Sequence, residues 1–177
     1  MTNLAGNFVL DPAHTTIGFV ARHAMVTKVR GNFTEFDSHI TIADNIADSQ
    51  AEVTTKAGSI DSGNADRDNH VKGEDFFNVE SFPEITFTAT EFKVDESGNG
   101  SVTGDLTIKG TTKPVTLEVE TDGIAEDPFG NTRLGFEAKG KINRTDFGVD
   151  FNAPLKTGGV LVSEEIKLEI EASAIKQ

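Results

Sequence analysis

The chain has 177 residues, which is enough for one domain with a sizeable core, and no composition shift or linker divides residues 1–177. Its formal net charge of −13 argues against a nucleic-acid backbone or an anionic membrane surface as the main partner, although solubility alone also explains such a charge. Cysteine is absent, which excludes disulfides and cysteine metal sites, and the absence of tryptophan and tyrosine leaves 13 phenylalanines whose surroundings we expect to be dry.

The N-terminal segment, residues 1–10, has neither the basic nor the apolar region of a secretory signal. No later run approaches the roughly 18 apolar residues of a membrane-spanning helix. We therefore predict a soluble, cytoplasmic protein without stable membrane insertion. If a leader had been removed, the same domain would be periplasmic or secreted.

A first strand is predicted at residues 8–10 and a second at 14–23, where apolar and polar residues alternate after the break at Asp11-Pro12. Residues 12–34 contain no carboxylate. They do contain five basic or imidazole side chains: His14, Arg22, His23, Lys28 and Arg30. In so acidic a chain, this patch either binds an anionic head group or is simply a solvated strand face.

Alternation continues towards the C-terminus, with changes of parity between Phe33 and Phe36 and again after Ala89 that predict bends or bulges. Residues 95–100 (DESGNG) predict a hairpin turn. Strands that are apolar on one face and joined by hairpins fit a sandwich or a closed barrel. We favour an antiparallel barrel of about eight strands, because closure removes exposed edges and this size can hold one small ligand.

Residues 64–87 are the one long segment that lacks strand periodicity. Asn64 as a cap and Gly73 as a stop predict a short helix near residues 64–72, with Arg67 and His70 on one face. Three large apolar rings follow the helix: Phe76, Phe77 and Phe82. We interpret the segment as a lid or plug; the alternative is a plain connection whose phenylalanines fill the core.

Motif searches exclude most catalytic and metal chemistry. The four histidines show no metal-ligand spacing, and we predict no metal site and no cofactor. Residues 32–34 and 143–145 match the glycosylation sequon, which carries little weight without a secretory signal. One enzymatic arrangement survives, in which the Asp66 carboxylate orients the His70 imidazole for acid–base chemistry from the preceding helical turn.

Several ordered motifs resemble one protein family. Residues 67–72 (RDNHVK), 75–78 (DFFN) and 82–87 (FPEITF) resemble the signature segment of the YceI-like family, which comprises polyisoprenoid-binding, lipocalin-like bacterial proteins. Further similarities cover nearly the whole chain. They lie at residues 11–19, 104–115, 135–138, 146–148 and 155–162.

The resemblance implies an all-β, extended antiparallel lipocalin-like barrel around a long apolar channel for a polyisoprenoid lipid. The ligand would be an isoprenoid quinone or a prenyl phosphate, and no catalytic residue carries over. We predict that six phenylalanines line the channel: Phe19, Phe76, Phe77, Phe82, Phe87 and Phe136. Four residues are predicted near the polar head: Arg22, His23, Arg67 and His70.

Three functions remain open at this point. The leading one is a soluble binding or carrier protein for the lipid. The second is a protein-interaction or stress-response module, which a narrow interior without a ligand-sized cavity would favour. The third is an enzyme acting on an isoprenoid ligand through Asp66 and His70. A homodimer is possible, and the sequence leaves the lipid's chain length and head group open.

Overall fold

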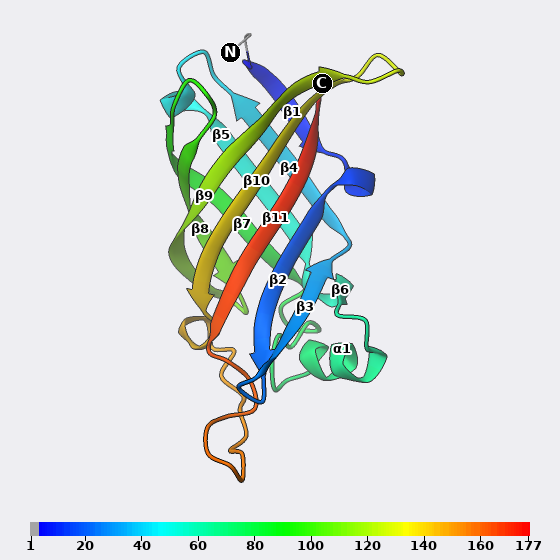
Figure 1. Cartoon of the computed structure of the whole chain (residues 1–177), viewed down its shortest axis with the longest axis vertical. Helices are drawn as coiled ribbons and strands as arrows, with labels where there is room; N and C mark the ends of the chain where they lie inside the picture. Colours follow the sequence, from blue (N-terminus) through cyan, green and yellow to red (C-terminus); the bar gives the residue numbers. More distant parts are fainter. Residues whose placement is uncertain (1–3) are drawn as a thin grey trace.

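The computed structural model describes residues 4–177. Its strands are β1 (Gly6–Leu10), β2 (Thr16–His23), β3 (Thr27–Phe33), β4 (Phe36–Ile42), β5 (Gln50–Lys56), β6 (Ile60–Asp61), β7 (Glu84–Val94), β8 (Gly100–Ile108), β9 (Thr111–Glu126), β10 (Thr132–Asn143) and β11 (Glu165–Lys176). Its helices are α1 (Ala65–Lys72) and the short 3-10 turns η1 (Pro12–His14), η2 (Ile46–Asp48), η3 (Ala57–Ser59) and η4 (Arg144–Phe147). Figure 1 shows the strands wrapped into an elongated barrel.

The barrel is closed and antiparallel. The strands β1, β4, β5, β7, β8, β9, β10 and β11 follow one another around it, and β11 pairs with β1 again, which makes eight strands. This confirms the predicted barrel and not the sandwich. Each strand of the ring has two neighbours, so no edge of the ring is left unpaired.

Three short strands extend the wall at one end. β11 pairs with β1 through residues 174–176 and with β2 through residues 167–171, so β2 continues the line of β1. β3 pairs with β2, and β6 pairs with β3, over the two residues Asn32 and Phe33. No pairing joins β6 to β7 within residues 4–177. The wall is therefore open at this end, between β6 and β7.

The predicted changes of parity appear as breaks in the strands. Residues 34–35 separate β3 from β4, and the register of β7 against β8 shifts between Ala89 and Glu91. At the predicted hairpin, the Asp95 carboxylate accepts hydrogen bonds from the backbone N–H groups of Ser97 and Asn99. Each break lets the following residues change face and bends the wall.

Glycines lie under aromatic rings at two places in the wall. A Cβ at Gly31 would lie 2.5 Å from the ring of Phe19, which is its cross-strand neighbour. A Cβ at Gly104 would overlap the ring of Phe87 and lie 2.7 Å from the Thr88 carbonyl oxygen. The two rings therefore lie flat across the neighbouring strand, where only glycine leaves room for them.

Two apolar clusters stabilise opposite ends of the barrel. One contains Phe8, Leu10, Leu134, Ala172 and Ala174. The other contains Phe76, Leu106, Ile108, Val115, Phe147 and Val149. The buried apolar residues therefore form two separate clusters and not one continuous core along the barrel.

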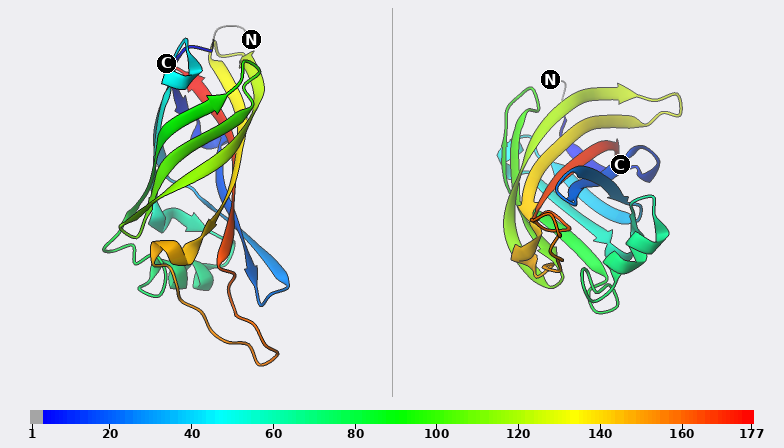
Figure 2. Two further views of the ribbon diagram at one scale, coloured as in Figure 1. Left: turned by 90° about the vertical axis from the view of Figure 1, so that its left-hand side faces the viewer. Right: turned by 60° about the horizontal axis from the view of Figure 1, so that its bottom comes forward.

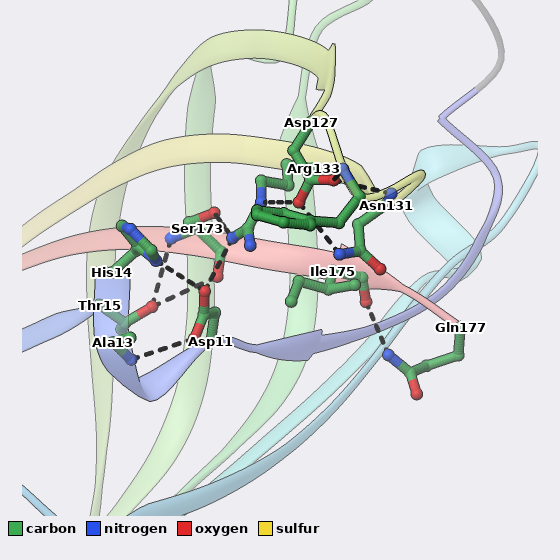
Figure 3. A network of polar contacts seen from close by, with 11 residues as sticks. Asp11, Ala13, His14, Thr15, Asp127, Asn131, Arg133, Ser173, Ile175 and Gln177 are labelled. Carbon is green, nitrogen blue, oxygen red and sulfur yellow. Dashed lines mark hydrogen bonds and ion pairs between the residues drawn. The ribbon is translucent and has the colours of Figure 1, made fainter.

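An ion-pair network fixes the outer side of the barrel near the C-terminus (Figure 3). Arg133 donates from Nη1 to Asp11 Oδ2 and from Nε to Asp127 Oδ2, each at 2.8 Å. His14 Nδ1 also lies 2.8 Å from Asp11 Oδ2. Hydrogen bonds from Arg133 and then from His14 lower the pKa of Asp11 to about 2. The pKa of Asp127 is lowered strongly by the Asn131 backbone N–H, followed by Arg133.

Asp11→Asn is expected to lower the free energy of unfolding at neutral pH. It should also make the free energy of unfolding less dependent on pH in the acid range. The depressed pKa means that Asp11 stabilises the fold above the unfolded-state pKa of about 3.9, and this contribution is lost as the pH falls towards about 2. Urea denaturation at several pH values between about 5 and 2 measures it. The difference in free energy of unfolding between the variant and the wild type should become smaller as the pH falls. A difference that stays constant contradicts the assignment, and so does the same pH-dependent difference in the exposed control Asp44→Asn.

Candidate functional site

A cavity of about 850 Å³ runs inside the barrel. Every one of the eleven strands contributes wall residues, and most of the wall residues are apolar. At one end the wall includes Leu4, Ile42 and Ile46, and at the other it includes Phe147 and Phe151. The inward faces of the alternating strands therefore enclose a cavity within the usual size range of ligand pockets.

Helix α1 and turn η4 lie at the same end of the barrel, away from the C-terminus (Figure 2). The helix has the predicted cap, since Asn64 Oδ1 accepts the Arg67 backbone N–H at 3.0 Å, and it ends before Gly73 as expected. Asp68 is buried and accepts hydrogen bonds from the backbone and hydroxyl of Ser62, which follows β6. The helix is thereby attached to the open edge of the wall and helps to close it.

Five of the six predicted phenylalanines border the cavity: Phe19, Phe76, Phe77, Phe87 and Phe136. Phe82 does not, because it lies in the turn before β7, where strand alternation has not begun, and its ring packs against Gly110. Four further phenylalanines of the wall were missed in the prediction: Phe33, Phe92, Phe147 and Phe151. Phe33 and Phe92 lie beside breaks in strand register, and Phe147 and Phe151 lie in η4 and the loop after it, so strand alternation did not predict their side of the wall.

Arg67 and His70, the two α1 residues predicted near the head group, also border the cavity. Arg67 donates from Nε to Ser62 Oγ at 2.8 Å and from Nη2 to the Ser62 carbonyl at 2.7 Å. The His70 ring packs edge-on against Phe76 and Phe151, with centroids 5.2 and 5.3 Å apart. Its Nε2 lies 2.9 Å from Asp75 Oδ2.

The acid–base pair of the enzyme hypothesis is not formed. His70 has Asp75 as its carboxylate partner, and no hydrogen bond or ion pair joins it to Asp66 within the described part of the chain. The i,i+4 spacing placed the two residues on one helical face, but the turn after the helix brings Asp75 back to the imidazole instead. The geometry thus offers an exposed His70–Asp75 contact in place of the predicted dyad.

His23 and Arg22 lie where β2 ends. His23 forms a bridge with Val162, and both border the cavity. Arg22 borders it too, yet it also lines an outer groove of about 120 Å³ with Val20, Lys28 and Arg30. Because the alternation that turns Phe19 and His23 inward turns Val20 and Arg22 outward, we assign the Arg22 guanidinium to the outer groove.

Arg144 was missed by the sequence analysis. This first residue of η4 is only 5% exposed and borders the cavity. Its guanidinium donates to three backbone carbonyls, those of Ser163 and Val149 at 2.8 Å and that of Val162 at 3.2 Å. Burial lowers its pKa. The patterns around it in the sequence were a glycosylation sequon and the family similarity at residues 146–148, and neither predicted that Arg144 is buried.

Within residues 4–177, no group of three or more His, Asp or Glu side chains is placed to hold a metal ion. None of its helices has the length and apolar character needed to cross a membrane. The cellular compartment stays a prediction.

Comparison with known proteins identifies the family. The family model described as the YceI-like domain matches residues 8–174. The chain belongs to the YceI-like domain family. A UPF0312 protein of Staphylococcus aureus is 39% identical over 170 residues, which cover 94% of this chain and 95% of the relative.

Solved structures of YceI-like proteins share the barrel. The crystal structure of the Campylobacter jejuni YceI protein is 33% identical, with a TM-score of 0.75 over 88% of this chain and 90% of that one. A polyisoprenoid binding domain from Saccharophagus degradans has a TM-score of 0.65 over 98% of this chain and 99% of that one. At 12% identity, the second likeness shows the YceI-like fold alone.

Proposed function

We propose that this protein binds and carries a long polyisoprenoid lipid, either an isoprenoid quinone or a prenyl phosphate, in the barrel cavity. The observation that carries the proposal is the cavity itself, which has a volume of about 850 Å³ and a mostly apolar wall. The description of the S. degradans neighbour as a polyisoprenoid binding domain supports the same ligand class.

The distribution of polar groups supports a ligand with one polar end. The charged residues bordering the cavity come from α1, from the end of β2 and from η4, and α1 and η4 lie at one end of the barrel (Figure 2). We propose the chain-lining role for Phe19, Phe76, Phe77, Phe87 and Phe136, without Phe82. The head-group role is proposed for Arg67, His70 and His23, and no longer for Arg22.

The apolar wall alone does not select one lipid. At roughly 0.8 kcal/mol per buried CH₂, a prenyl chain of a few tens of carbons would nominally exceed the ceiling of about 18–21 kcal/mol for any non-covalent complex. The lipid leaves a membrane and not water, so most of this transfer free energy cancels. Cavity length and head-group contacts must then decide which lipid is bound.

Mass spectrometry of an organic extract tests the proposal. The protein is purified without detergent, and the extract should contain a prenyl lipid in a stoichiometric amount. An extract that is empty, even after expression in several bacterial hosts, contradicts the carrier function. The interaction-module alternative required a narrow interior without a ligand-sized cavity, and the observed cavity removes that argument for it.

A further inference from the structure

The charges that border the cavity are opposite in sign to the charge of the protein. Three arginines, Arg22, Arg67 and Arg144, border it together with His23 and His70, whereas Asp66 is the one carboxylate among the wall residues. The chain as a whole carries a net charge of −13. The Arg22 guanidinium belongs to the outer groove. Without it, the wall still has two arginines, Arg67 and Arg144, and one carboxylate, that of Asp66.

Arg144 is the buried member of this set. A guanidinium removed from water costs free energy unless an opposite charge compensates it. Arg144 forms no ion pair with any described residue, and the same holds for Arg67. The carboxylates whose charge acts on Arg144 are those of Glu164 and Asp150, and both of these residues are exposed. The guanidinium is therefore a buried cation without a counter-ion of its own.

Its three carbonyl contacts do not require a charge. They hold the loop of residues 149–163, but Asn152 already holds the same loop with a neutral side chain, donating to the Val162 carbonyl at 2.8 Å and accepting from the Val162 N–H at 3.1 Å. A guanidinium has five N–H donors. Arg144 uses one on each nitrogen for the loop, which leaves one free donor on each terminal nitrogen.

We propose that the ligand's head group is anionic, of the phosphate class, and that Arg144 is the residue that binds and selects it. This inference rests on the proposed function and narrows its two ligand classes to one. The two free donors of Arg144 match two oxygens of a phosphate, and Arg67 supplies a second uncompensated cation from α1. A neutral quinone ring would leave both cations without a partner.

Binding of three lipids with related chains tests the inference. The probes are geranylgeranyl phosphate, geranylgeraniol and an isoprenoid quinone, each measured by displacement of a fluorescent prenyl probe from the intact protein. The absence of tryptophan and tyrosine gives a low fluorescence background. The wild type should bind the phosphate about tenfold or more tightly than the alcohol or the quinone, as expected for hydrogen bonds to a charged group.

The variants separate head-group binding from folding. Arg144→Gln should remove most of the preference for phosphate while leaving the affinity for the alcohol within about threefold, and Arg144→Lys, which keeps the charge, should retain part of it. The control is Arg133→Gln, because Arg133 lies in the ion-pair network and not at the cavity. It should leave the phosphate-to-alcohol ratio unchanged. A variant that has lost its fold loses the alcohol as well, which the measurement shows directly.

The outcomes distinguish the inference from the proposed function. If the wild type binds the alcohol or the quinone as tightly as the phosphate, or if Arg144→Gln and Arg144→Lys lower the affinity for all three probes equally, the inference is overturned and the carrier function stands. If the wild type binds none of the three, both are overturned.

Discussion

Phe136→Asp is expected to lower the affinity for a prenyl lipid by about a hundredfold or more. Phe136 lies on β10 with its side chain at the cavity, where it packs with the cluster around Phe8 and Leu10. When the lipid binds, a carboxylate at this position must either be desolvated against the hydrocarbon chain or keep water molecules in the space that the chain would occupy. Either cost is several kcal/mol, and each 1.4 kcal/mol is about tenfold in affinity. Displacement of a fluorescent prenyl probe measures the change.

Two matched variants keep this result interpretable. Phe129→Asp makes the same chemical change in the turn after β9, at a side chain that is 88% exposed, and should leave binding unchanged. Ala138→Phe changes the next inward residue of β10, which lies opposite Val119 and Ile170 of the wall, and reduces the space without adding charge. It should also weaken binding.

A protein that keeps its circular dichroism spectrum and its lipid affinity with either inward change would show that the lipid does not lie along β10. Equal losses in Phe129→Asp and Phe136→Asp would point to a general effect of charge and not to the cavity. The combination expected here, two losses and one unchanged control, requires a ligand inside the barrel.

The fold was largely predictable because strand alternation is a local property. The alternation within a strand, such as residues 102–108, predicts from that segment alone which side chains point inward. The turn at Asp95 is likewise recognisable from its own residues. Helix α1 was predictable for the same reason, since Asn64 and Gly73 mark its ends within ten residues. The closure of the ring was inferred indirectly, from the need to pair every edge.

The site was less predictable because it depends on which distant segments meet. Arg144 is buried by the loop of residues 149–163, and nothing in its own neighbourhood indicates this. Asp66 was the predicted partner of His70, and only the path of the chain after the helix brings Asp75 to the imidazole instead. Phe82 looks like the other rings in sequence, yet it packs outside, on Gly110.

The interrupted strands and the helix form one arrangement. Because β6 pairs only with β3 among the described strands, the wall stops before β7 at this end, and α1 with the following phenylalanines Phe76 and Phe77 lies across the gap. A strand that paired with both β6 and β7 here would have put apolar side chains at the same place, in the position of α1. The gap between β6 and β7 is therefore what allows Arg67 and His70 to border the cavity at this end.

Gly100→Ala is expected to lower the free energy of unfolding by about 3 kcal/mol or more. Gly100 begins β8 with φ of +155°, a conformation that L-residues rarely adopt, and such backbone strain costs roughly 1–3 kcal/mol. A Cβ at this position would also overlap the carbonyl oxygen of Lys93 and lie 2.9 Å from Val94 Cα. Both are backbone atoms of the paired strand β7, so the hairpin itself must move to relieve the overlap.

Urea denaturation of Gly100→Ala beside Gly58→Ala measures this cost. Gly58 is the matched control, because no atom lies within 4 Å of a Cβ placed there and its φ is not positive. The control should change the midpoint little, and the Gly100 variant should lower it steeply. If both variants unfold at the wild-type midpoint, the β7–β8 hairpin tolerates a shift of its pairing. The cavity wall would then be more adaptable than the register of β7 with β8 and of β8 with β9 implies.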